Sequence, residues 1–188
     1  MKWPEYLSKF EDVLNGSNSE HPYDNPEYVE YVKMNNSRMK RWLKKASLTD
    51  ETAKILDMVQ CRQKWILIAE PWCGDAANIA PIIDLMAEYS GKIDFEIELR
   101  DGDSHLIDSY LTNSGKSIPK LIARDEKGQD VFVWGPRPAE CQSMIERNKE
   151  CDLTAIEKKM AIQVWYNENE GVAIQQEIRE LLQASCLI

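Results

Sequence analysis

The sequence lacks any long apolar run. None of its segments approaches the ~18 apolar residues that a membrane-spanning helix needs, and Met1–Tyr6 has no apolar stretch of the signal-peptide kind. We therefore expect a cytoplasmic protein with no membrane partner.

Basic residues are also outnumbered, because 23 Lys and Arg against 32 Asp and Glu give a net charge of -9. This charge disfavours nucleic acid and anionic membranes as partners and leaves proteins and small molecules.

Paired cysteines are missing as well. The chain has five cysteines, an odd number, and no close C-x-x-C pair, so neither a disulfide framework nor a zinc knuckle is indicated. No metal site is expected. The phosphate-binding loop G-x-x-x-x-G-K and the serine-hydrolase elbow G-x-S-x-G are absent, so nucleotide hydrolysis and serine hydrolysis have no support. If a cysteine matters in this chain, it matters through its reactivity.

Helical patterns occupy both ends of the chain. Four segments carry apolar residues at helical spacing: Pro4–Leu14, Pro26–Lys45, Thr49–Val59 and Thr154–Gln183. We expect an N-terminal helical extension over 1–48 and a C-terminal helical extension over 151–188. The second extension is expected to pack on the domain between them, and dimerisation is its alternative role.

Residues 49–150 have the pattern of an α/β domain. Trp65–Ala69 is a short continuous apolar run, typical of a strand covered on both faces. Ile93–Leu99 alternates apolar and acidic residues, as a strand with one exposed face does. The remaining predicted elements are helices over Ala76–Tyr89 and Ser104–Leu111, strands over Lys120–Ala123 and Val131–Trp134, and a helix opened by Pro138. We expect a mixed central sheet flanked by helices, with the first two strands parallel.

Cys73 stands where the first predicted strand ends and the next helix begins. Unpaired backbone N–H groups and the helix dipole stabilise an anion at such a position, and the thiolate is the nucleophilic form of cysteine. Glu70 and Asp75 flank Cys73, and their carboxylates disfavour a thiolate. Cys73 is therefore a candidate reactive thiol whose acidity the sequence leaves open. A small buried residue at a helix start is the alternative interpretation.

The residues around Cys73 resemble the thioredoxin superfamily. Trp72–Gly74 followed by Ile79–Pro81 matches the pattern W-C-G-P-C-x-x-x-A-P in residue type and offset. The string Glu70–Ala76 is similar to a bacterial, thioredoxin-like branch. The resemblance covers roughly Ala53–Lys149 and implies a thioredoxin-like fold with extra helices at both termini.

A second motif carries the same resemblance. Ser117–Lys120, followed by Lys127-Gly128, is similar to the cis-proline strand and hairpin turn of the superfamily. In that family the cis proline lies beside the active cysteine, and the neighbouring backbone pairs with a bound substrate. The resemblance thus implies a set of substrate-positioning residues around Cys73: Trp72, Gly74, Asp75, Ile118 and Pro119. For the aromatic member of this set, a core position is the alternative.

Two basic residues are candidate anion contacts. Lys120 replaces the small or β-branched residue usual after the cis proline, and a solvated lysine is the alternative interpretation. Arg137 is framed by Pro136 and Pro138 on a stiff loop that suits an anion contact. An exposed charge is the alternative for that arginine.

The chain departs from the family pattern at two positions. The resolving cysteine of the family falls at Ala76, and the buried acid of the preceding strand falls at Leu67. In the family, both residues serve the step in which the second cysteine resolves the mixed disulfide. The chain therefore cannot form an active-site disulfide within the motif, and an external thiol would have to complete any catalytic cycle.

Two main functions are compatible with these residues. The first is a single-cysteine thiol–disulfide oxidoreductase in cell redox homeostasis, in which Cys73 forms a mixed disulfide with a protein or a low-molecular-weight thiol. No bound cofactor is expected, and glutathione or another external thiol would serve as reductant. The alternative is a non-catalytic thioredoxin-fold module that binds proteins. Glutathione-dependent iron–sulfur binding is weaker because a second glutathione-contacting motif is not apparent. Monomer and homodimer both stay open.

Overall fold

The computed structural model describes residues 1–185. The helices are α1 (Trp3–Leu14), α2 (Pro26–Lys45), α3 (Asp50–Met58), α4 (Gly74–Ser90), α5 (Ala139–Lys149), α6 (Ala155–Asn169) and α7 (Val172–Ala184). The strands are β1 (Gln63–Ala69), β2 (Ile93–Leu99), β3 (Lys120–Arg124) and β4 (Asp130–Trp134), and a short 3-10 helix, η1, spans Leu106–Ser109. One of the five cysteines, Cys186, lies outside the described residues.

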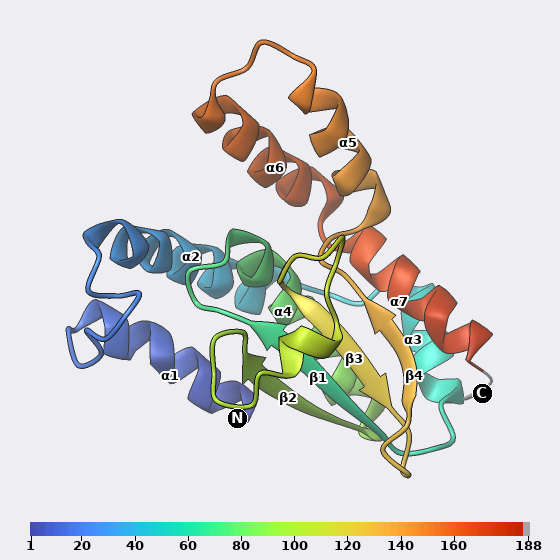
Figure 1. The fold of residues 1–188 in the computed structure, drawn as a ribbon. Coiled ribbons are helices and arrows are strands. Elements are labelled where there is room, and N and C mark those ends of the chain that lie inside the picture. Colours follow the sequence, from blue (N-terminus) through green and yellow to red (C-terminus); the bar gives the residue numbers. More distant parts are fainter. Residues whose placement is uncertain (186–188) are drawn as a thin grey trace.

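The four strands form one mixed sheet in the order β2-β1-β3-β4. β1 pairs with β2 in parallel, and β3 pairs antiparallel with both β1 and β4. The parallel pair needs a crossover, which α4 supplies. The prediction of an α/β fold with a mixed central sheet, flanking helices and extra helices at both termini is confirmed (Figure 1).

Helix α4 lies at the centre of the molecule. It packs against the sheet on one side and against α2, α3 and α7 on the others. Because it is covered on most sides, the helix is buried continuously from Ala76 to Ile83, where only Asn78 is polar, and this stretch contains Pro81. Its largest fully buried side chains are Ile79, Ile82, Ile83 and Met86. The N-terminus of α4, where Cys73 stands, is therefore fixed by packing on several elements.

The added N-terminal helices cover one side of this core. The ring of Trp3 on α1 lies 6.1 Å from that of Phe95 on β2, and Tyr6 and Phe10 are buried beneath the same helix. α2 begins at Pro26, as predicted, and the side chain of Asn25 caps it by accepting the backbone N–H of Glu27. Helices α1 and α2 thus reach the end of β1 from outside the sheet.

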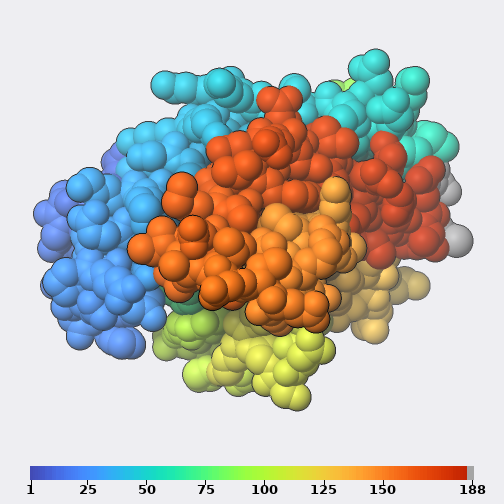
Figure 2. All heavy atoms as spheres, turned by 90° about the horizontal axis from the view of Figure 1, so that it is seen from above, coloured from blue at the N-terminus to red at the C-terminus, as the bar shows by residue number. Residues whose placement is uncertain are grey.

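Helices α5 and α6 form a hairpin between β4 and α7 that projects from the sheet (Figure 1). Seen from above, the hairpin lies across the middle of the molecule beside α2 (Figure 2), and Lys159 of α6 donates to the hydroxyl of Tyr31 on α2 at 3.1 Å. Its α6 exposes the apolar side chains Ile156, Met160 and Val164, whereas α7 buries Ile174, Ile178 and Leu182.

The predicted helix over Ser104–Leu111 is wrong in extent. Only η1, a four-residue 3-10 helix, forms there. His105, the residue before it, adopts a left-handed backbone conformation with φ 51°, and within the short helix only Ile107 is buried. With one apolar anchor, this segment has too little burial to extend a helix.

No helix within residues 1–185 combines the length and the apolar character that crossing a membrane requires.

Gly171, at the α6–α7 junction, provides a test of the packing of α7. Its φ is +81°, and a Cβ there would stand 2.9 Å from Cδ1 of Ile82. Gly91 also has a positive φ, +61°, but open space around it. Alanine at either site takes on about 1–2 kcal/mol of backbone strain, and only Gly171→Ala adds the overlap. Urea unfolding should show the larger stability loss for Gly171→Ala. Equal losses would contradict tight packing of this junction on α4.

Candidate functional site

Cys73 occupies the N-cap position of α4 directly after the turn that ends β1. Its backbone N–H donates to the carbonyl oxygen of Glu70 at 3.0 Å, which fixes the turn. The Sγ atom accepts the backbone N–H of Ala76 and donates to the carbonyl oxygen of Ile118, both at 3.5 Å. The Ile118–Pro119 peptide bond is cis. The two motifs that the sequence places 45 residues apart therefore meet at the sulfur atom.

The environment of Cys73 favours the protonated thiol. The residue is only 7% exposed. Burial and then the negative charge of Asp75 raise the pKa of the Cys73 thiol to about 12, against smaller opposing effects from backbone N–H groups of α4 and from Arg137. The helix N-terminus therefore does not overcome desolvation, and in the resting chain the thiol is neutral at pH 7.

Asp75, in the first turn of α4, joins three elements beside the thiol. Its carboxylate accepts from Nε and Nη2 of Arg137 at 2.8 and 2.7 Å and from the hydroxyl of Tyr166 on α6 at 2.9 Å. Arg137 also donates to Gln142 at 3.1 Å. The anion that Arg137 contacts is thus the chain's own Asp75, and the interpretation of Arg137 as a solvent-exposed charge is wrong. This network holds the α5–α6 hairpin over the N-terminus of α4.

Arg38 of α2 also approaches this helix N-terminus. A Cβ added to Gly74 would lie 3.0 Å from Nη1 of Arg38, so glycine permits this approach. Arg38 donates to Asn35 at 2.8 Å, and Asn35 donates to the carbonyl oxygen of Pro71 at 2.9 Å. Sequence reasoning missed this contribution of α2, because only the fold brings residues 35 and 38 beside residues 71–74.

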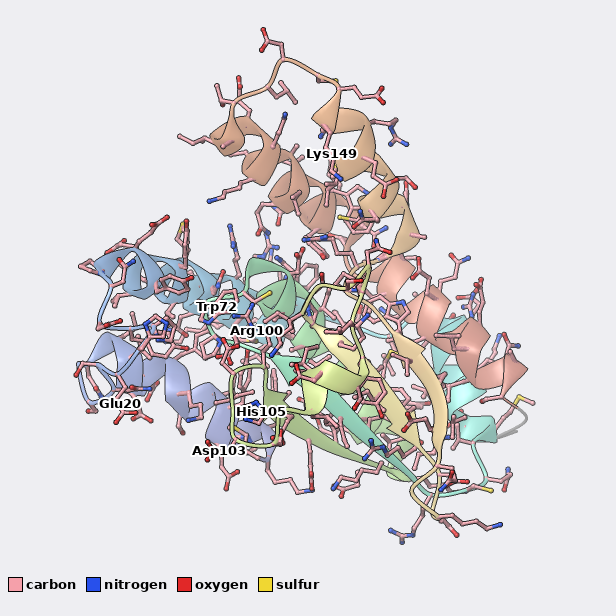
Figure 3. The ribbon with its side chains drawn as sticks, viewed as in Figure 1. Glu20, Trp72, Arg100, Asp103, His105 and Lys149 are labelled. Atoms are coloured by element: carbon pink, nitrogen blue, oxygen red, sulfur yellow. The ribbon has the colours of Figure 1, made fainter. Side chains whose placement is uncertain are left out.

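Trp72 packs within the chain. The guanidinium carbon of Arg100 lies 4.6 Å from its ring centroid, and Tyr28 of α2 meets it edge-on at 5.6 Å. Figure 3 shows Trp72 and Arg100 together, near the end of β2. Residues of the chain itself therefore contact the ring for which the resemblance implied a substrate-positioning role.

Lys120 directs its ammonium group into the chain. It is 5% exposed, and Nζ donates to the hydroxyl of Thr112 and, at 3.0 Å, to the carbonyl oxygen of Gly135. Burial lowers its pKa. The alternative interpretation of Lys120 as a solvated lysine is wrong, and its ammonium group donates to groups of the chain itself. Gly135 itself has φ +107°, and a Cβ there would stand 2.6 Å from the carbonyl oxygen of Pro119. The loop after β4 is thus pressed against the cis-proline segment.

Comparison with known proteins places this site in a family. A family model described as thioredoxin matches residues 23–152, which is more than half of the chain. The chain belongs to the thioredoxin family. Two solved structures share the fold of this thioredoxin-family chain. A protein of unknown function from Pseudomonas aeruginosa has a TM-score of 0.61 and 13% identity, over 84% of this chain and 92% of that one.

The second structure is an HIV epitope-scaffold with a TM-score of 0.58 and 14% identity, over 98% of this chain and 99% of that one. At these identities the likeness concerns the fold alone. No curated protein matches the sequence.

In this thioredoxin-family chain, the sites of the missing acid and the missing cysteine are apolar and buried. Leu67 and Ala76 are both 0% exposed. Of the other described cysteines, Cys61 and Cys151 are exposed and Cys141 is buried, and all are free thiols. Within residues 1–185, His, Cys, Asp and Glu side chains nowhere form a group of three that could hold a metal ion.

Two further buried polar side chains are Glu70, which the sequence marked only as a carboxylate flanking Cys73, and Tyr6, which it did not mark. Glu70, at the end of β1, is 5% exposed, and its Oε1 accepts the backbone N–H of Asp101 at 3.1 Å. Burial raises the pKa of Glu70 to about 7. Tyr6 of α1 is fully buried. The only sequence signal for Tyr6 is its place among the aromatic residues of the first helix.

Asp75→Asn tests the electrostatic control of Cys73. Removing the carboxylate lowers the pKa of the Cys73 thiol, because the negative charge of Asp75 raises it. We expect iodoacetamide to label Cys73 severalfold faster at pH 8 than in wild type, with exposed Cys61 and Cys151 as internal references in peptide mass spectrometry. Tyr166→Phe is the control, since it removes one hydrogen bond and keeps the charge. An unchanged or slower rate in Asp75→Asn would contradict this account.

Glu70→Gln tests the buried carboxyl through pH-dependent stability. The folded pKa of about 7 lies above the ordinary value of 4.5 for a glutamate, so the folded state favours the protonated form. Its stabilising effect is complete below pH 4.5 and is lost as the pH rises through 7. From the size of the shift, this loss is on the order of 3 kcal/mol.

Urea unfolding between pH 5 and pH 8 measures this loss in stability. The decrease should be smaller in Glu70→Gln than in wild type. Asp84, whose pKa burial also raises to about 7, contributes a separate decrease, which Asp84→Asn removes. Identical slopes in wild type and Glu70→Gln would exclude a perturbed Glu70.

Proposed function

We propose that this thioredoxin-family chain is a single-cysteine thiol–disulfide exchange protein, with Cys73 as the reacting thiol. The supporting observation is the position of Sγ, 3.5 Å from both the Ala76 N–H and the Ile118 carbonyl that precedes the cis proline. A substrate strand that pairs with the backbone at Ile118 would bring its sulfur beside Sγ. The single-cysteine form of the motif follows from Ala76 in the resolving position.

The exchange involves two steps with balanced electrons. Cys73 loses its proton and attacks a substrate disulfide; the new S–S bond joins Cys73 to one substrate sulfur, and the other leaves as a thiolate that takes up a proton. An external thiol such as glutathione then attacks the mixed disulfide. Cys73 returns as a free thiol, and the substrate sulfur leaves in a disulfide with the external thiol. We place this chemistry in the cytoplasm, where low-molecular-weight thiols are abundant.

A second candidate function is a non-catalytic protein-binding module. Burial favours it, because Cys73 is 7% exposed and its pKa is raised to about 12. Under this alternative, Cys73 is a small buried residue that caps α4, and the chain keeps the peptide-binding groove of the fold without turnover. Thiol exchange requires the resting Cys73 thiol to lose its proton. A binding module has no such requirement.

Reaction with oxidised glutathione distinguishes the two functions. The experiment uses a variant in which serine replaces Cys61, Cys151 and Cys186, so that Cys73 and the buried Cys141 remain. Thiol exchange predicts a glutathione adduct that maps to Cys73 and is removed by reduced glutathione. Adding Cys73→Ser should abolish the adduct.

The module predicts no adduct at Cys73 in the native state, although the same cysteine reacts in urea. That result would overturn the thiol-exchange proposal. An adduct at Cys141 alone would also overturn it. Both outcomes are read from the same peptide map.

A further inference from the structure

Two arginines of α2 stand near the Cys73 turn without an acidic partner. Arg38 and Arg41 are three residues apart, so their side chains share one face of the helix. Both are half-buried, and neither forms a salt bridge within residues 1–185. Three other arginines are paired with aspartates: Arg100, Arg124 and Arg137. A half-buried cation without an acid lowers stability, so two of them in a chain of net charge -9 point to a ligand of opposite charge.

A buried amide holds Arg38 against the turn. Asn35 is 1% exposed; its Oδ1 accepts Nη1 of Arg38 at 2.8 Å, and its Nδ2 donates to the carbonyl oxygen of Pro71 at 2.9 Å. The same Nη1 would lie 3.0 Å from a Cβ on Gly74, the residue that follows Cys73. Two hydrogen bonds therefore fix the guanidinium beside the reacting residue. Of its five N–H donors, only one on Nη1 has an acceptor within the described part of the chain.

Arg41 extends the positive charge along the same face of α2. Its guanidinium carbon lies 5.0 Å from the ring centroid of Trp42, and its Nη2 is buried without a hydrogen-bond partner within residues 1–185. Trp42 in turn donates Nε1 to Asn78 of α4 at 2.9 Å. Arg41 is thus seated where α2 packs on α4, one helical turn from Arg38, and no group of the chain satisfies it.

The chain's own carboxylates do not occupy the position in front of Arg38. Asp75 is the acidic residue of the first turn of α4, and its oxygens accept from Arg137 and Tyr166. Burial is the largest influence on the pKa of Arg38 and lowers it; Asp75 opposes this effect and Arg41 adds to it. The result is a cationic position at a helix N-terminus, where an anion is stabilised.

We propose that Arg38, supported by Arg41, binds a carboxylate group of the disulfide that Cys73 attacks. This inference rests on the thiol exchange proposed above and names its substrate class, which is a disulfide with a negative charge a few bonds from sulfur. Consecutive Cα atoms are about 3.8 Å apart, so an anion held beside Gly74 lies near the thiol.

The anion contact changes no bond in the exchange. Cys73 gives its proton to solvent and bonds to the substrate sulfur whose carboxylate is bound, and the other sulfur leaves as a thiolate that takes up a proton. An anionic external thiol then attacks the mixed disulfide, Cys73 returns as a thiol, and the two small sulfurs leave as a disulfide. The arginines bind and orient the substrate in both steps.

Three aliphatic disulfides of different charge test this substrate class. 3,3′-Dithiodipropionate is anionic, bis(2-hydroxyethyl) disulfide is neutral and cystamine is cationic. Each is mixed at pH 8 with the variant in which serine replaces Cys61, Cys151 and Cys186, and the adduct at Cys73 is followed by mass spectrometry. Each rate is divided by the rate for the same disulfide with the chain unfolded in urea, which removes differences in intrinsic reactivity.

The anionic disulfide should react at least about tenfold faster than the neutral one, which is the effect of one hydrogen bond between charged groups. Cystamine should react more slowly than either. The net charge of -9 alone predicts the reverse order. A preference for the anion therefore requires a local cationic site.

Substitutions on α2 identify the residues responsible. Arg38→Gln should lower the ratio of the anionic to the neutral rate by at least about tenfold. Arg38→Lys keeps the charge without the planar fork and should restore part of the ratio, and Arg41→Gln should lower it less than Arg38→Gln. Arg62→Gln is the control of equal charge, because Arg62 is exposed before the start of β1, whereas Cys73 follows its end. The ratio should be unchanged in Arg62→Gln.

The carboxylate can belong to a small molecule or to an acidic side chain of a protein. Oxidised glutathione represents the first source. A disulfide-linked dimer of a short peptide, with blocked termini and one glutamate beside its cysteine, represents the second. The arm in which Arg38→Gln lowers the rate identifies the source, and independence of Arg38 in both arms would overturn the anion site.

The outcomes separate this inference from the function on which it rests. Failure of every disulfide to form an adduct at Cys73 in the folded parent variant would overturn thiol exchange itself. Adducts without a preference for the anion, or with a preference that Arg38→Gln leaves intact, would overturn the anion site and leave thiol exchange standing. An equal loss of the ratio in Arg62→Gln would also overturn the site, because it would show an effect of net charge alone.

Discussion

The Cys73 thiol is held out of water, and this desolvation sets the state of the whole site. A cysteine at a helix N-terminus is commonly expected to be acidic. Here the first turn of α4 offers its N–H groups, yet the pKa of the thiol is raised to about 12. The loss of hydration outweighs the attraction of the backbone dipoles, and the nearby Asp75 adds to the effect. Any chemistry at this sulfur must therefore begin with removal of a proton in a dry environment.

The helices added to the thioredoxin fold supply the walls of this environment. Arg38 of α2 and the Asp75–Arg137–Tyr166 network both lie at the N-terminus of α4. Through these polar side chains, helices α2 and α6 of the terminal extensions contact the site. The apolar core of the sheet provides no such contacts. The extensions are thus part of the site and not only a support for the sheet.

The sequence predicted the fold well because its signals are local. A continuous apolar run indicates a covered strand, as in β1, and helical spacing around Pro81 indicates α4. The meeting of Cys73 with Ile118 followed only from a resemblance, since composition and periodicity carry no information on long-range contacts. The partners of Lys120 and Arg137 were not predictable, because a buried lysine and a solvated one look alike in a sequence.

A direct titration of Cys73 tests the central claim that the resting thiol is protonated by desolvation. The ¹³Cβ chemical shift of Cys73, labelled in the variant without Cys61, Cys151 and Cys186, reports its ionisation by NMR. The account predicts no thiolate shift for Cys73 below about pH 10, well above the usual cysteine value, while unfolding in urea restores ordinary titration. Ionisation of Cys73 in the folded chain below pH about 8 would contradict the account, because it would show an acidic thiol.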